Sequence, residues 1–242
     1  LHGIKAFLVV VGSGVAAGLL FVGIISYFVK SFVSVASGGF KGSDDGIVAP
    51  TRSPRETTAP GTLDVCGIGI ESSGVLPNPI RVDEGLEPVD SATLGPGSQE
   101  EVRTVEDECQ WEFVEGGYGN FVLTFRYESV MEDSSEKSKV EISKDDFDAF
   151  KERVMGEFLN IESQGEPRLS GVDGSYYFYG ESGGGERYSL VGRVKSSVFE
   201  LSIESTGENS LIEGGVPESV FLAEVRQLTP YIASDFERMV PD

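Results

Sequence analysis

Few residues of this 242-residue chain have the chemistry of a catalytic centre. The single histidine is His2, so Ser-His-Asp and Cys-His catalysis lack a base in the rest of the sequence. The stretch GESGG at 180–184 matches the G-x-S-x-G nucleophile motif, but it lies in a glycine-rich turn between two predicted strands. Ordinary zinc sites need histidines or several thiolates. We therefore expect no catalytic residue, no metal ion and no other cofactor.

Two polar patterns leave alternatives open. The 40 Asp and Glu residues include the acidic runs 106–108 and 145–148, from which a glycosidase-like carboxylate pair could be built. Solvated surface and helix-start positions explain both runs more simply. The tyrosine-rich stretch 176–179 suits either a sugar- or peptide-binding face or the core and edge packing of a strand. An enzyme that uses carboxylates alone remains a third hypothesis for the function.

Charge is distributed unevenly along the chain. Residues 1–62 hold five basic and three acidic residues, whereas the remainder holds 14 basic and 37 acidic residues. An acidic field of this size repels nucleic acids and anionic lipids, because their binding depends on Lys and Arg. We expect no nucleic-acid partner. The acidic surface indicates either solubility or a basic partner.

Residues 6–29 form an uncharged run between Lys5 and Lys30. At about 1.5 Å per residue the run can cross a hydrocarbon core of about 30 Å, and it exceeds the apolar region of about 7–15 residues of a signal peptide. We predict a transmembrane anchor over residues 1–36.

The predicted span contains a stripe of small residues. Its members, which let another membrane helix approach closely, are Ser13, Gly14, Ala17 and Gly18. The stripe predicts helix–helix docking with an integral membrane protein; the alternative is that glycine is simply common in membrane helices.

The two cysteines, Cys66 and Cys109, lie 43 positions apart. A lone pair of this kind suggests a disulfide in an oxidising compartment, while two unrelated buried thiols in the cytosol are the alternative. Lys and Arg counts beside the span do not decide its orientation. The hypothesis of a disulfide decides the orientation instead. It predicts a single-pass protein of the plasma membrane, with a cytoplasmic N-terminus and an extracytoplasmic C-terminal domain.

A linker rich in Gly, Ser, Thr and Pro at 37–62 precedes a globular pattern over 63–242. Alternation and turn residues predict strands, and the period of apolar residues predicts helices. The expected strands are 109–114, 120–129, 175–179, 188–195 and 198–204, and the expected helices are 143–160, 217–228 and 231–240. Ser143 is the predicted N-cap of the first helix, and Pro230 is expected to break or kink the last. We expect an α+β fold, with an antiparallel sheet and helices packed on one face.

Three motifs carry a family resemblance: DVC at 64–66, CQW at 109–111 and GVDGSYY at 171–177. Together they resemble a domain of unknown function that is widespread in actinobacterial cell-envelope proteins, often lipoproteins, and the resemblance covers about residues 63–240. It implies that Cys66 and Cys109 are the family's disulfide and that Trp111 packs beside it in the core. The chain departs from the lipoproteins because it lacks a cysteine just after its apolar run.

These features predict a non-enzymatic accessory or assembly subunit of a larger membrane complex. By analogy, the host is an actinobacterial respiratory oxidase supercomplex or cell-envelope machinery, contacted through the transmembrane helix and the outer domain. The alternative is an envelope binding module for a lipid, sugar or peptide.

Overall fold

The computed structural model of the chain describes residues 58–70, 73–83, 87–93, 102–115, 118–134, 136–206 and 215–241. The predicted span at 6–29, its small-residue stripe and linker residues 37–57 lie outside the described residues. No helix in the described part is both long and apolar enough to cross a membrane. The chain divides into the units Leu1–Thr51 and Arg52–Asp242, and the second unit contains every described residue.

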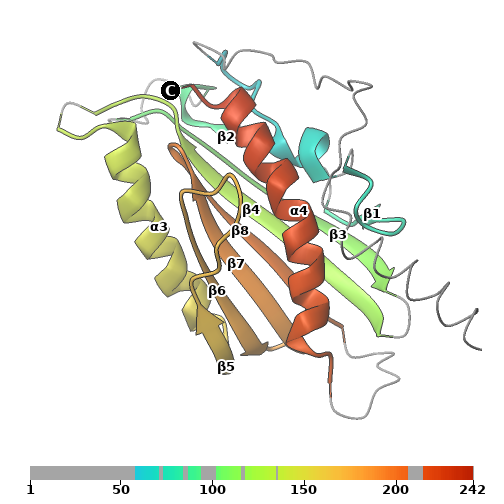
Figure 1. The fold of residues 1–242 in the computed structure, drawn as a ribbon. Coiled ribbons are helices and arrows are strands. Elements are labelled where there is room, and N and C mark those ends of the chain that lie inside the picture. Colours follow the sequence, from blue (N-terminus) through green and yellow to red (C-terminus); the bar gives the residue numbers. More distant parts are fainter. Residues whose placement is uncertain are drawn as a thin grey trace, which may run out of the picture. The chain divides into compact units, whose positions relative to one another are not determined.

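The described residues form an eight-stranded antiparallel sheet, which confirms the predicted α+β class (Figure 1). In chain order the strands are β1 (Ile80–Arg81), β2 (Val89–Asp90), β3 (Thr104–Glu115), β4 (Gly119–Val130), β5 (Asn160–Gly165), β6 (Gly174–Glu181), β7 (Glu186–Val194) and β8 (Ser197–Ser205). Their order across the sheet is β1-β3-β4-β8-β7-β6-β5, and β2 also pairs with β3. The β4–β8 pairing therefore joins an N-terminal hairpin to a four-stranded meander.

Two α-helices of the described part, α3 (Lys139–Gly156) and α4 (Glu218–Met239), pack on opposite faces of the sheet. The prediction that the helices share one face is wrong. Strand β8 explains the difference, because Val198 packs with α3 while Phe199 and Leu201, on the other side of the pleat, pack with α4. Apolar residues on both sides of a strand require a cover on each side.

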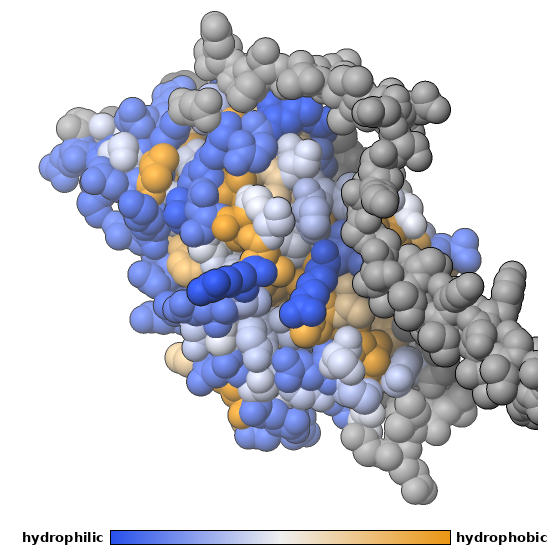
Figure 2. Space-filling view, in the orientation of Figure 1, coloured by the Kyte–Doolittle hydropathy of each residue, from blue (hydrophilic) through white to orange (hydrophobic). Residues whose placement is uncertain are grey.

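The main core lies between the sheet and α4, which crosses the strands in Figure 1. Phe236 of α4 stacks on Phe199 with ring centroids 5.8 Å apart and meets Tyr127 edge-on at 5.6 Å. A smaller core holds Phe150 and Val154 of α3. On the side seen in Figure 2, hydrophilic residues cover most of the described surface, and apolar residues show only in small separate areas.

Cys66 and Cys109 form a disulfide, as predicted. Cys66 opens a single π-helical turn, η1 (Cys66–Ile70), and Cys109 lies in β3. Trp111, two residues further along β3, is fully buried in the same core as both cysteines. The bond therefore fastens the segment before β1 to the α4 side of the sheet.

Helix α3 begins and ends earlier than the sequence predicts. Its N-cap is Ser138, which forms a capping box with Glu141, and the predicted N-cap Ser143 is instead a buried residue whose hydroxyl donates to the Lys195 carbonyl. The helix ends at Gly156. The expected stripe residue Leu159 is exposed and lies just before β5, a strand that was not predicted.

Helix α4 runs unbroken through Pro230, so the predicted break is wrong. Pro230 has no N–H to donate, and the Thr229 hydroxyl donates to the Val225 carbonyl one turn earlier. Burial of the apolar face of α4 outweighs the missing hydrogen bond.

The first described residues are tied to the domain. The Thr58 hydroxyl donates to the Met239 carbonyl at 2.8 Å, and Arg103 donates to the Thr58 carbonyl at 2.9 Å. Arg103 also pairs with the buried Asp90 at 2.7 Å, and its hydrogen bonds lower the pKa of Asp90 to about 2. Residues 58–62 of the predicted linker thus belong to the folded domain.

Candidate functional site

On the α3 side of the sheet, the helix covers only part of the surface. Phe150 and Val154 of α3 pack on Phe178, Val191 and Val198 of β6, β7 and β8. The polar side chains of β3 and β4 on this side are exposed or half-buried, whereas Glu200 and Ser202 of the adjoining β8 are buried. We call this surface the open face.

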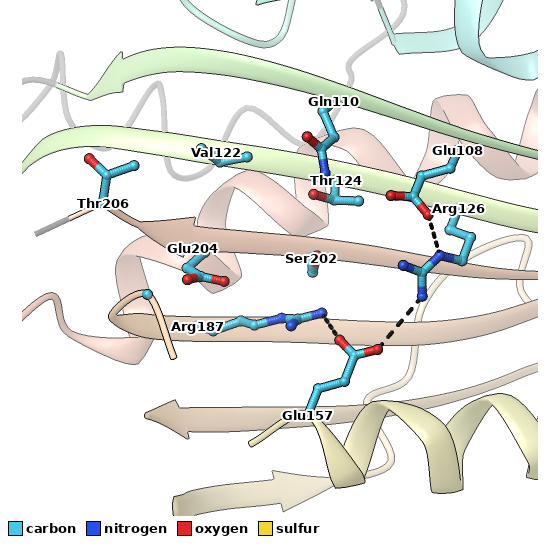
Figure 3. Close-up of a pocket in the computed structure, with 11 residues that line it drawn as sticks. Glu108, Gln110, Val122, Thr124, Arg126, Glu157, Arg187, Ser202, Glu204 and Thr206 are labelled. Atoms are coloured by element: carbon cyan, nitrogen blue, oxygen red, sulfur yellow. Dashed lines mark hydrogen bonds and ion pairs between the residues drawn. The ribbon is translucent and has the colours of Figure 1, made fainter. Parts of the chain in front are cut away.

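A hollow of about 400 Å³ lies on the open face, beside the C-terminal end of α3 (Figure 3). Its lining residues are Glu108, Gln110, Val122, Thr124, Arg126, Glu157, Gly184, Arg187, Ser202, Glu204 and Thr206. Among the described residues that line it, only Val122 has an apolar side chain. The hollow is therefore suited to polar ligands.

The sheet register sets these side chains in rows across the strands. Glu108, Arg126 and Glu200 are consecutive cross-strand partners on β3, β4 and β8, which places opposite charges directly beside one another. The next row consists of Gln110, Thr124 and Ser202. A charged row therefore borders a neutral row of hydrogen-bonding groups.

The charged row belongs to a larger ion-pair network. Arg126 Nε lies 2.7 Å from Glu108 Oε2, and Arg126 Nη1 lies 3.3 Å from Glu200 Oε2. Arg187 Nη2 lies 2.7 Å from Glu200 Oε1 and also 2.7 Å from Glu157 Oε2. Two arginines thus hold three carboxylates in fixed positions.

Glu200 is the buried centre of the network, with 1% of its side chain exposed. Burial raises the pKa of its carboxyl, while the Arg187 and Arg126 guanidinium groups oppose that rise. Removing one partner of a buried pair typically costs about 3–5 kcal/mol, because the other charge remains without compensation. The network is therefore a rigid floor for the open face.

Glu157, the C-cap residue of α3, links the helix to this floor. Figure 3 shows its two carboxylate oxygens facing Arg187 and Arg126. The nearest nitrogen of Arg187 lies 2.7 Å away and that of Arg126 lies 3.7 Å away. The end of α3 is thereby fixed as one wall of the hollow.

A second hollow of about 330 Å³ lies at the opposite side of the Glu108–Arg126 pair, since both residues line it too. Glu87, Val89, Glu106 and Glu128 are among its other lining residues. Phe150 and Arg153 of α3 also line it, and the Arg153 guanidinium stacks 3.9 Å from the centroid of the Phe150 ring.

The structure separates the residues singled out from the sequence. Cys66, Cys109 and Trp111 are buried on the α4 side of the sheet, away from the open face. Tyr177 and Tyr179 pack toward the α4 core, whereas Tyr176 packs toward the α3 core, so the tyrosines form no common face.

The serine of the GESGG stretch has a structural role in a turn. Ser182 is buried. Its hydroxyl donates to the Gly185 carbonyl at 3.0 Å, and the hydroxyl oxygen accepts from the Gly184 N–H at 3.3 Å. Within the described part of the chain, no group of three or more His, Cys, Asp or Glu residues is arranged to hold a metal ion.

The ion-pair network was missed at the sequence level, although a signal was present. Arg126 lies between Phe125 and Tyr127, and Glu200 lies between Phe199 and Leu201. Alternation places both charges on the face opposite to those aromatic and aliphatic side chains. Single charges within otherwise apolar strands mark the polar face of the sheet.

Fold and site together define a disulfide-bonded α+β domain with an uncovered polar sheet face. Comparison with known proteins finds no matching family model, no matching curated protein and no matching solved structure. Of the features that the sequence resemblance implied, the disulfide is present. The chemistry of the open face is therefore the best guide to the function.

Proposed function

We propose that the chain is a membrane-anchored extracytoplasmic protein that serves as an accessory or assembly subunit of a larger membrane complex. In this proposal the predicted span at 6–29 anchors the chain, and the open face of the domain binds the host. The sequence resemblance suggests an actinobacterial respiratory oxidase supercomplex or cell-envelope machinery as host.

The rigid polar floor of the open face carries the proposal. A large sheet surface beside a fixed ion-pair network offers many preorganised hydrogen-bonding groups, and preorganisation lowers the entropic cost of binding. The disulfide supports an oxidising compartment, because such bonds persist outside the cytosol. Glu108, Glu157 and Glu200 are each held by an arginine, an arrangement that favours recognition over proton transfer.

A small-ligand binding module is the second candidate. The hollow of about 400 Å³ falls within the usual range of ligand pockets, about 300–1,000 Å³. Its polar lining favours a sugar or a peptide over a lipid, because an acyl chain there would contact desolvated polar groups.

The test is purification of the tagged full-length chain from its native membrane in mild detergent, followed by size exclusion and mass spectrometry. We expect a stoichiometric set of integral membrane proteins to remain bound. Thr124→Trp fills the middle of the open face and should release that set. Ser234→Trp places the same side chain at an exposed position of α4 and should retain it.

Two results would decide against an accessory subunit. One is a lone monomer from native membranes, and the other is equal retention of the partners by both tryptophan variants. A small molecule released from the purified chain, and absent after Thr124→Trp, would support the binding module instead. Thermal melts of both variants establish that each is folded.

A further inference from the structure

We propose that the open face binds a basic, extended segment of the partner protein, with Lys and Arg side chains entering the two hollows. This inference rests on the proposed function, since it names the partner chemistry that the open face recognises.

The charge of the open face favours a basic partner. Six acidic side chains and three arginines line the two hollows. The acidic residues are Glu87, Glu106, Glu108, Glu128, Glu157 and Glu204, and the arginines are Arg126, Arg153 and Arg187. Two of these arginines are already engaged by carboxylates of the network. The surface therefore attracts cations and repels anionic ligands.

Some of these carboxylates are not engaged in an ion pair with another described residue. In the described part of the chain, neither Glu106 nor Glu204 forms an ion pair, and they lie in different hollows. Each can accept a charge-assisted hydrogen bond from an incoming ammonium or guanidinium group.

The neutral row favours a polypeptide over a small cation. Gln110 and Thr124, which are half-buried, lie between the charged positions, and their amide and hydroxyl groups can pair with the N–H and C=O groups of a peptide backbone. A polyamine has no carbonyl for these donors. Val89 and Val122 provide apolar contacts for the aliphatic stems of Lys and Arg.

The dimensions of the open face suit an extended segment. Along β3 the face runs from Glu106 to Glu112, six residue steps or about 20 Å at the rise of a strand. A segment of about six extended residues matches this length.

The test uses the full-length chain in detergent and a fluorescent peptide of about ten residues that alternates Lys and Thr. Fluorescence anisotropy gives its dissociation constant at low and at physiological ionic strength. The double variant Glu106→Gln/Glu204→Gln should weaken binding about fivefold to thirtyfold. The control Glu136→Gln/Glu152→Gln, at exposed positions outside both hollows, makes the same change in net charge and should alter binding by less than about twofold.

Three outcomes would overturn the inference. They are no binding of the basic peptide, equal weakening by both double variants, and displacement of the peptide by spermine at equal concentration. The native purification and the peptide measurement test different proposals. If Thr124→Trp releases the host while the peptide fails to bind, the proposed function stands and the basic-segment inference fails. If the peptide binds as expected while native membranes yield a lone monomer, the accessory-subunit proposal fails.

Discussion

At the residue scale, Glu200 and Asp107 are two acidic strand residues. Their surroundings stabilise the ionised carboxylate to different extents. Glu200 is more deeply buried, yet two guanidinium groups face its carboxylate. Asp107 has no such direct partner among the described residues. Burial raises the pKa of Asp107 to about 6, and the negative charges of Asp64 and Asp83 add to the effect. Ionising Asp107 therefore costs folding free energy.

Asp107→Asn should stabilise the domain at pH 8 and have little effect at pH 4. The folded-state pKa of Asp107, about 6, exceeds the unfolded value of 3.8. Between pH 3.8 and about 6, the folded protein therefore binds more protons than the unfolded chain. Stability falls as pH rises through this window, and an uncharged side chain abolishes that fall. We expect a gain on the order of 1–2 kcal/mol at pH 8, after allowing for partial exposure. Urea unfolding at the two pH values measures it, with the exposed Glu112→Gln as control.

Gly192 occupies a place in β7 where a larger residue does not fit. A Cβ atom there would lie 2.2 Å from Cζ of Phe199, in the middle of the α4 core. Gly192→Ala should therefore destabilise the domain by about 1–3 kcal/mol, because the Phe199 ring must move within a packed core. At Gly183 an added Cβ has no atom within 4 Å, so Gly183→Ala is the matched control. Equal melting temperatures for the two variants would contradict this account.

At the element scale, helix α3 depends on its capping box. The Ser138 side chain accepts from the Glu141 N–H, and the Glu141 side chain accepts from the Ser138 N–H. Ser138→Ala removes one half of this exchange and should cost about 1 kcal/mol of unfolding free energy. Ser234→Ala, at an exposed position within α4, is the control for serine loss alone. Because Glu157 at the far end of α3 contacts both arginines, amide exchange there should also rise in Ser138→Ala.

The strands with clear alternation could be predicted from the sequence, and the boundaries around α3 could not. In β4, Phe121, Leu123 and Phe125 alternate with polar residues, and the structure confirms the strand. After α3, Phe158 and Leu159 continue the apolar period of the helix, so periodicity extends the prediction too far. Tertiary contacts override this periodicity. The Leu159 N–H donates to the Glu181 carbonyl, and β5 then follows along the edge of β6.

The candidate site was less predictable than the fold for a physical reason. The partners Glu108, Arg126 and Glu200 come from three strands, and only the register brings them side by side. A sequence shows which residues share a face of one strand, but not which strands become neighbours. The β4–β8 pairing joins residues 68 to 84 positions apart, and no local pattern signals it.

At the scale of the whole molecule, the disulfide closes a loop of 43 residues around β1, β2 and the start of β3. In the chain-entropy model such a loop contributes about 4 kcal/mol. Reduction, or the double variant Cys66→Ser/Cys109→Ser, should lower the melting temperature by roughly 8–16 °C for a domain of this size. Differential scanning calorimetry with and without reductant measures the shift. An unchanged melting temperature after confirmed loss of the bond would contradict the prediction.

The disulfide and the contacts of Thr58 also determine how the domain responds to force. If the chain is held at residue 58 and at its C-terminus and then stretched, residues between Cys66 and Cys109 bear no tension, because the covalent bond bypasses them. The oxidised domain should therefore lengthen by about 150 Å less than the reduced domain when fully extended. The early load falls on the Thr58–Met239 and Thr58–Arg103 hydrogen bonds. The disulfide thus sets a limit on how far a pulling force can extend the domain.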